Sequence, residues 1–408
     1  MLIRFEVSNF RSIRDAVELS MVAVDKDRTE ARPMPNLGES LLPVAAVYGP
    51  NASGKSNVVA ALAWLHSAVR DSLRFWDDGI PVEPFAFAQG PETATEFVVE
   101  STVAGVRYEY VVELDWNGIA YEGLFHYPEK KRRRIFEREG GELKLQRGLG
   151  NLSGTRELLT ARALVLSIAR RFDEPLVSEF VSSLLRIQVL GLRASRGIPF
   201  IRDVSTESRF ESEEPRGRTK ALALLRMADL GIDDVVFDNV IEGGGADSAA
   251  ARVQRRTRLL HRIGDELAPL DFAAESEGTR TWYRLIGPVL TALEAGSLLL
   301  FDELDASLHP TLSEHLIRLF HDPETNPRGA QLIFTSHDTS LLNHLNRDEV
   351  WLTEKGRDGA TRLGALAEFA GERVRKSQNL ERAYLHGRFG GVPEVDRADV
   401  LRAIGLIG

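Results

Sequence analysis

The sequence contains no cysteine. Disulfide bonds, thiolate metal ligands and a cysteine nucleophile are therefore excluded, and a reducing compartment such as the cytoplasm suits the chain. Long apolar runs are also missing, since the most apolar windows, such as 297–301, are far too short to cross a bilayer. The first residues alternate like a strand and do not form a charged region followed by an apolar one. We therefore expect a cytoplasmic protein with neither a signal peptide nor a membrane partner.

Positive charge is in deficit, with 51 Lys and Arg against 60 Asp and Glu and a formal net charge of −9. Dedicated nucleic-acid binders are usually basic. DNA binding through a local groove stays possible, but the net charge does not indicate it. Sustained heptads are missing as well, so no long coiled-coil arm is expected.

Short apolar strands and amphipathic helices alternate at both ends of the chain, which indicates an α/β protein. The strands expected there are 2–8, 44–48, 298–301 and 331–335, and the helices are 56–72, 311–321 and one that follows Gly278. Gly287-Pro288 should kink this last helix. The middle of the chain predicts an antiparallel lobe at 85–147, helices at 155–196 and 219–230, and a loop at 242–258.

The segment 49–56 reads Gly-Pro-Asn-Ala-Ser-Gly-Lys-Ser and joins an expected strand to an expected helix. This pattern in this context predicts a phosphate-binding loop, whose backbone N–H groups and following helix N-terminus attract phosphates. Lys55 would neutralise the β- and γ-phosphates of ATP, and the hydroxyl of Ser56 would bind Mg²⁺. The residues assigned to nucleotide binding are Gly49, Asn51, Ala52, Ser53, Gly54, Lys55, Ser56 and Asn57.

An apolar strand, 298–301, ends in Asp302 and Glu303. At the carboxyl edge of a parallel sheet these acids would lie beside the phosphate loop. Asp302 would bind Mg²⁺, and Glu303 would act as the general base toward the attacking water.

Two further motifs surround this strand. Ser276 and Gly278 precede a helix and could present a hydroxyl and an amide to a γ-phosphate. The segment 152–156 has a sequence similar to that around Ser276, but it lies far from the acidic strand, and we interpret it as a helix cap. His337 follows the expected strand 331–335 and could also contact the γ-phosphate.

The order and spacing of these four motifs resemble the ABC-type ATPases, in which Walker A, signature, Walker B and switch histidine follow one another. The resemblance implies that Ser276 and Gly278 of one protomer complete the ATP site of another, that Asp305 forms the D-loop and that His337 is the switch. Glu277 stands where transporters have glycine, which is similar to the RecF/SMC/OLD branch instead. The implied fold is a P-loop ABC-type ATPase head with an inserted antiparallel β lobe and a helical lobe.

Additional segments resemble the AAA-type, RloA/AbiL-like ATPases of phage defence, with the PARIS and Septu ATPases as relatives. These segments are 8–13, 49–57, 305–310 and 384–393. The resemblance implies an ATPase sensor or scaffold, dimeric or a higher even oligomer, that controls a separate nuclease-type effector. We expect its N-terminal core half at 1–150, a helical insertion at 151–260 and its C-terminal core half at 261–408. The alternative is a RecF-like DNA-repair ATPase that binds DNA directly.

Two assignments stay open at this point. Gln89, or less favourably Gln188, could be the Q-loop glutamine that reaches Mg²⁺. The basic run 130–134 could meet an acidic partner or nucleic acid, but the neighbouring glutamates favour a solvated hairpin turn.

Overall fold

The structure is a computed structural model, and it describes residues 1–192, 205–211, 215–228, 231–242, 252–370 and 380–385. Its centre is a six-stranded sheet in the order β11-β15-β16-β5-β17-β18, parallel except for the last pair. The strands are β5 (Val44–Tyr48), β11 (Gln188–Leu190), β15 (Leu298–Phe301), β16 (Gln331–Thr335), β17 (Val350–Lys355) and β18 (Thr361–Ala365). Every residue of β5, β15 and β16 is buried, which explains the uninterrupted apolar runs of β5 and β15 and the apolar centre, 332–334, of β16.

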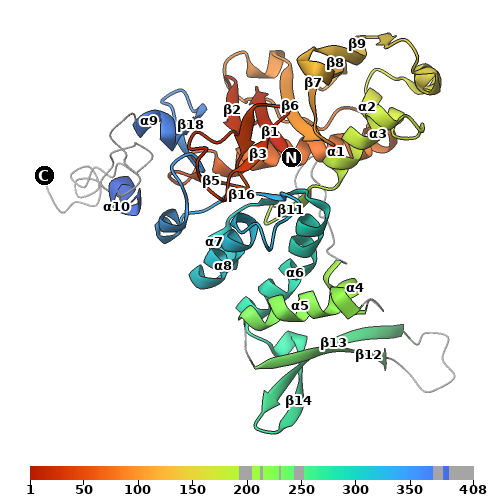
Figure 1. Ribbon diagram of the computed structural model, residues 1–408. Coiled ribbons are helices and arrows are strands. Elements are labelled where there is room, and N and C mark those ends of the chain that lie inside the picture. The colour runs from red at the N-terminus through yellow and green to blue at the C-terminus, as the bar shows by residue number, and fades with distance from the viewer. Residues whose placement is uncertain (193–204, 212–214, 229–230, 243–251, 371–379, 386–408) are drawn as a thin grey trace, which may run out of the picture.

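Helices cover both faces of this central sheet (Figure 1). Alternate residues of β5 and β15 point into two separate cores. One core packs against α1 (Lys55–Phe75), and the other packs against α6 (Glu277–Ala295) and α8 (Pro310–His321). The short α7 (Leu304–Ser307) links β15 to α8. Among the described residues, no helix is both long and apolar enough to cross a membrane.

A second, seven-stranded antiparallel sheet lies on the far side of α1, in the order β10-β9-β8-β7-β6-β1-β2. Trp64 of α1 stacks on Phe97 of this sheet, with ring centroids 5.0 Å apart. The strands are β1 (Leu2–Ser8), β2 (Val17–Ser20), β6 (Thr95–Val103), β7 (Val106–Leu114), β8 (Ile119–His126), β9 (Arg133–Glu139) and β10 (Glu142–Leu145). The helix α1 is thus packed between two sheets, which fixes the position of its N-terminus at the phosphate loop.

A third unit extends away from the central sheet at the start of α6 (Figure 1). It contains α4 (Ser205–Glu211), α5 (Pro215–Ala228) and the sheet β12 (Ile232–Glu242), β13 (Arg252–Ile263) and β14 (Glu266–Asp271). The remaining elements are β3 (Arg32–Met34), β4 (Glu39–Leu41), α2 (Val165–Ala169), α3 (Pro175–Leu185), α9 (Leu366–Ala370) and α10 (Leu380–Leu385). The described residues also include five 3₁₀ segments: Gly90–Glu92, Pro128–Lys130, Gly150–Leu158, Phe272–Ala274 and Thr339–His344.

The structure confirms the expected strands at 44–48, 298–301 and 331–335. The helices expected at 155–196 are confirmed in part, by α2 and α3; the end of a 3₁₀ segment and the strand β11 occupy other parts of this stretch, and 193–196 lie outside the described residues. The expected loop at 242–258 is wrong over 252–258, which belongs to β13 and pairs with β12, while 243–251 lie outside the described residues. The range 151–260 therefore contains sheet as well as helix.

Candidate nucleotide site

The phosphate loop leaves the carboxyl end of β5 and ends at Gly54, which caps α1 in a left-handed conformation with φ 105°. Gly49 also has positive φ, 151°. These conformations favour glycine, and a Cβ would add a steric conflict at both positions. At Gly54 it would lie 2.0 Å from Thr361 Oγ1, and at Gly49 it would lie 2.3 Å from Thr353 Oγ1. The N–H groups at the start of a helix lack helical partners and attract anions; in α1, Asn57 N already donates to Gly54 O (3.0 Å).

Lys55 is buried, with 5% of its surface exposed. Its Nζ donates to the carbonyl oxygens of Gly49 (2.9 Å) and Pro50 (3.1 Å). Burial lowers the pKa of Lys55, and the charges of Asp302 and its neighbours Asp305 and Glu303 oppose that shift. The loop's cation and the acids after β15 therefore lie within electrostatic reach of one another at one edge of the sheet.

Asp302 and Glu303 are held by Thr335, the last residue of the neighbouring strand β16. Thr335 Oγ1 donates to Asp302 Oδ1 (2.7 Å) and accepts from the backbone N–H of Glu303 (2.8 Å). Asp302 is buried, whereas the Glu303 side chain is exposed. Glu303 has φ 55°, an uncommon conformation for a residue other than glycine and one that recurs at functional sites.

His337 follows β16 with its side chain exposed, and its backbone N–H donates to Asp305 Oδ1 (3.0 Å). Asp305 lies in α7, directly after the two acids. The expected switch and D-loop residues are thus joined by a hydrogen bond within one chain. In the phosphate loop, Asn51 and Ala52 are exposed, Ser53 is buried, and Ser56 and Asn57 are half-buried in the first turn of α1.

Ser276 and Gly278 lie at the N-terminal end of α6, beside the three-stranded sheet (Figure 1). Ser276 caps this helix, because its Oγ accepts from Thr279 N (3.1 Å). Both residues are exposed, and among the described residues no hydrogen bond joins either of them to the phosphate loop. One chain alone therefore does not bring these two residues to the loop.

The site offers oxygen ligands suited to Mg²⁺, namely the Asp302 carboxylate and the Ser56 hydroxyl. Within the described ranges, no group of three or more His, Asp or Glu side chains could hold a metal ion alone. Mg²⁺ is usually bound by one or two carboxylates together with substrate phosphates, so the residues present fit this ion with ATP.

The structure also shows where the two Q-loop candidates, the segment 152–156 and the basic run 130–134 lie. Gln89 is exposed and begins a 3₁₀ turn, and Gln188 begins β11 with its Nε2 donating to Arg186 O. The segment 152–156 lies inside a 3₁₀ helix and forms no side-chain cap, so our interpretation of a cap was wrong. In the basic run, Arg132, Arg133 and Arg134 pair with Glu109, Glu129 and Glu137 respectively.

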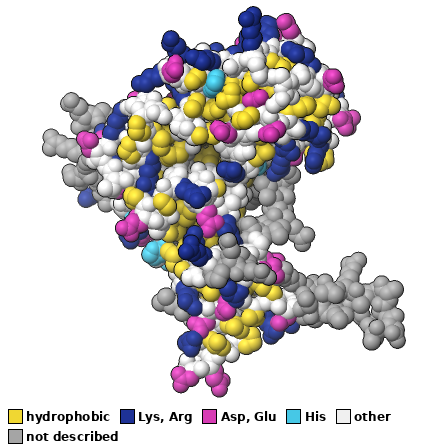
Figure 2. Space-filling model, turned by 45° about the vertical axis from the view of Figure 1, so that its right-hand side comes forward, with side chains coloured by type: hydrophobic (Ala, Val, Ile, Leu, Met, Phe, Trp, Pro, Cys, Tyr) yellow, Lys and Arg dark blue, Asp and Glu magenta, His cyan; other side chains and the backbone are white. Residues whose placement is uncertain are grey.

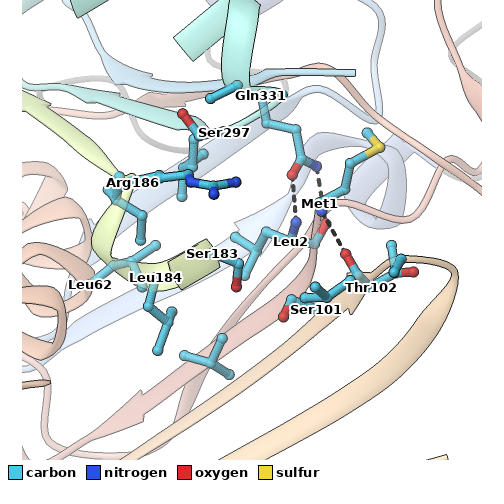
Figure 3. A pocket seen from close by; sticks show the side chains of 17 residues that line it. Met1, Leu2, Leu62, Ser101, Thr102, Ser183, Leu184, Arg186, Ser297 and Gln331 are labelled. Atoms are coloured by element: carbon cyan, nitrogen blue, oxygen red, sulfur yellow. Dashed lines mark hydrogen bonds between the residues drawn. The ribbon is translucent and has the colours of Figure 1, made fainter. Parts of the chain in front are cut away.

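A separate pocket of about 230 Å³ lies at the opposite, amino edge of the central sheet (Figure 3). Leu298 and Gln331, the first residues of β15 and β16, line it. The Gln331 amide bridges the two sheets, because it accepts from Leu2 N and donates to the carbonyl oxygens of Leu2 and Leu42. This pocket is lined by residues other than those of the phosphate loop.

The parallel sheet, the phosphate loop between β5 and α1, and the acids after β15 define a mixed α/β ATPase of the P-loop class. The chain belongs to the family described as "AAA domain, putative AbiEii toxin, Type IV TA system", whose model matches residues 44–343. This range includes all four motifs. Comparison with curated proteins gives no match.

Among solved structures, the chain is similar to heads of SMC proteins. The first is an SMC head bound to the "C-winged helix domain" of ScpA, with 12% identity, a TM-score of 0.46, and 89% of this chain and 97% of that chain covered. The second is the SMC head domain from Thermotoga maritima, with 13% identity, a TM-score of 0.42, and coverage of 89% and 98%. The third is an SMC head with an extended coiled coil bound to the C-terminal domain of ScpA, derived from Pyrococcus furiosus. Its identity is 14%, its TM-score is 0.38, and the coverage is 90% and 97%.

Proposed function

We propose that this protein binds Mg²⁺ and ATP at residues 49–57 and Asp302 and hydrolyses the nucleotide. The observation that carries the proposal is the geometry of the central parallel sheet. Strand β5 leads into the phosphate loop and Lys55, and β15, two strands away, leads into Asp302 and Glu303 at the same carboxyl edge. Transfer of a phosphoryl group to water requires three groups. These are a cation that binds the phosphates, a buried carboxylate that binds Mg²⁺ and an exposed carboxylate that accepts a proton from water.

The roles within the site follow from burial and hydrogen bonding. Asp302 is fixed by Thr335 and suits a metal ligand, while Glu303 is exposed and free to accept a proton from water as general base. His337 lies next to the same edge through its bond to Asp305 and would contact the γ-phosphate. When bound, Mg²⁺ would neutralise charge on the phosphates.

We further propose that the site is completed across a two-fold dimer. Ser276 and Gly278 stand exposed at the far end of α6, a helix of 19 residues that is about 28 Å long at 1.5 Å per residue. An isologous pair would bring the Ser276 end of each chain to the phosphate loop of the other and form two equal sites. ATP would then bridge two chains that each carry a formal charge of −9.

Mixing two inactive variants tests this arrangement. Lys55→Ala impairs the loop and Ser276→Arg impairs the partner's contribution, so a mixed dimer holds one doubly impaired site and one intact site. We expect ATP hydrolysis to recover partly on mixing. No recovery despite demonstrated subunit exchange would contradict independent sites built in trans. If the protein is a monomer that hydrolyses ATP at a rate per chain independent of protein concentration, the dimer is excluded.

The biological role that we propose is an ATPase sensor or scaffold in antiviral defence, acting on a separate nuclease-type effector. The family description names a putative toxin of a type IV toxin–antitoxin system, which supports a role beside a partner protein. Cells that carry the protein with its neighbouring genes should lose phage protection when Lys55 is replaced by Ala. Protection that survives this change would show that ATP binding is not required.

The alternative, a RecF-like DNA-repair ATPase, requires a basic surface. Figure 2 shows Lys and Arg intermixed with Asp and Glu on the face it presents, and the arginines of the run 130–134 are paired with acids. Binding to duplex DNA measured over a range of salt concentrations separates the two roles. Tight binding with a steep salt dependence would favour the alternative.

A further inference from the structure

The phosphate loop is joined by hydroxyl groups to parts of the chain that are remote in sequence. Thr361 Oγ1 donates to Ser53 O (2.9 Å) and lies 2.7 Å from Ser12 Oγ. Asn57 Nδ2 donates to the same Ser12 oxygen (2.6 Å). Ser53 Oγ lies 2.6 Å from Thr353 Oγ1, which donates to Tyr48 O (3.1 Å).

Which atom donates in each of these hydrogen bonds follows from the chemistry of the bonded groups. A carbonyl oxygen only accepts, so the single proton of Thr361 goes to Ser53 O, and Thr361 must accept from Ser12. The proton of Ser12 is thereby used, which leaves its oxygen to accept from Asn57. The same reasoning makes Ser53 the donor to Thr353. Two relays result. Ser12, Thr353 and Thr361 each donate once and accept once, and the Ser53 hydroxyl donates to Thr353.

Both relays meet at Ser53, in the middle of the loop. The carbonyl of Ser53 ends the relay from Asn57, and its hydroxyl starts the relay to Tyr48. These residues are shielded from solvent, since Ser53, Thr353 and Thr361 have relative exposures of 1%, 0% and 2%. Hydrogen bonds shielded from water in this way hold their partners firmly, and an unpaired group there is costly.

The same two threonines also confine the loop sterically. Their Oγ1 atoms occupy the space that a Cβ would take at Gly49 and Gly54. The glycines of the motif thus let the β17–β18 hairpin pack closely against the loop, in addition to allowing its backbone conformation.

We propose that Ser12, Thr353 and Thr361 are positioning residues that hold the phosphate loop in its anion-binding shape before nucleotide arrives. This inference rests on the proposed nucleotide binding. A loop already held in its bound conformation avoids the entropic cost of ordering on binding, so the three hydroxyls increase affinity without touching the ligand.

The test measures the Kd of Mg²⁺–ADP by calorimetry. Thr361→Val keeps the shape and removes the hydroxyl, and it should weaken binding about tenfold, because the loop loses the buried hydrogen bonds to Ser53 O and from Ser12. Thr361→Ser restores the hydroxyl and should bind within a few-fold of the wild type. In ATP hydrolysis, Thr361→Val should raise KM more than it lowers kcat.

Thr95→Val is the matched control. Thr95 is equally buried and its hydroxyl donates to Asn9 O (2.7 Å), but it lies on β6 in the other sheet. We expect this variant to lose stability and to keep the wild-type Kd. If it weakens ADP binding as much as Thr361→Val does, general destabilisation explains the effect and the proposal is wrong.

Two other outcomes have distinct meanings. Wild-type affinity in Thr361→Val overturns the positioning role and leaves nucleotide binding intact, whereas a wild type that does not bind ADP overturns the proposed function itself. Should Thr361→Val fail to fold, Ser12→Ala removes one relay at a half-buried position. It should weaken ADP binding several-fold, and an unchanged Kd would equally overturn the proposal.

Discussion

Replacing Thr335 with Val should separate nucleotide binding from hydrolysis. Thr335 is completely buried, and its hydroxyl contacts both Asp302 and the backbone of Glu303. Valine has almost the same shape but cannot form either bond. A hydrogen bond to a charged group contributes about 1.5–3 kcal/mol, and a buried N–H left unpaired costs about 1–3 kcal/mol. We therefore expect the free energy of unfolding to fall by about 3 kcal/mol.

Hydrolysis should suffer more than binding. Without Thr335, Asp302 and Glu303 lose the contact that fixes them relative to each other, and a displacement of about 1 Å in a catalytic group can cost about 10²-fold in rate. The phosphate loop keeps its own contacts. Phosphate release should consequently show kcat reduced by about 10²-fold, while calorimetry should show Mg²⁺–ADP bound within a few-fold of the wild type.

The control is Thr335→Ser, which keeps the hydroxyl and loses one methyl group. It should retain most of the activity and lose about 1 kcal/mol of stability. A wild-type kcat in folded Thr335→Val would refute the reasoning, because the two acids would then not depend on this hydroxyl. Equal loss of activity in both variants would point instead to general damage in the core around β16.

Three further predictions address the site and the fold. Glu303→Gln should bind ATP but hydrolyse it about 10²–10⁴-fold more slowly, and a wild-type rate would exclude this residue as the base. Lys55→Ala should lose affinity for nucleotide itself, since lysine contacts phosphates in the ground state, and calorimetry that gives an unchanged Kd would contradict the loop assignment. Burial lowers the pKa of His66 from 6.5 to about 4, so the unfolded chain binds the proton first and stability falls as the pH drops below about 6.5. Urea unfolding should show about 2 kcal/mol less stability at pH 5 than at pH 7.5, and His66→Gln should flatten this difference.

The parts of the fold that the sequence predicts well are those with a strong local pattern. Strands 44–48, 298–301 and 331–335 are buried on both faces; the first two are unbroken apolar runs, and the third is apolar at 332–334. The phosphate loop is similarly local, because motif, strand and helix are contiguous. The two acids after 298–301 lie at the same sheet edge as the loop, because β15 and β5 are parallel strands of one sheet.

Residues that act through distant contacts have no such pattern. Thr353 and Thr361 contact a loop about 300 positions earlier in the chain, and Ser12 contacts Thr361 at a separation of 349. Single serines and threonines are common in loops and strands, so nothing in their own surroundings distinguishes them. The strand β13 was missed for a related reason: it is stabilised by pairing with β12 and β14, and its own sequence is rich in arginine.

Pro288 shows how a tertiary contact overrides a local rule. Proline lacks an N–H, so it leaves the carbonyl of Arg284, four residues earlier, without its helical partner. Thr206 of α4 supplies the missing bond, since its hydroxyl donates to Arg284 O (3.1 Å) and accepts from Gly287 N (2.9 Å). The helix therefore continues from Glu277 to Ala295 through the proline. Because α6 lies between Ser276 and β15, the strand that Asp302 follows, this contact maintains a helix that connects the two halves of the proposed ATP site. Thr206→Val should accordingly lower the stability of α6, measured by hydrogen exchange of its amides, and Thr206→Ser should restore it.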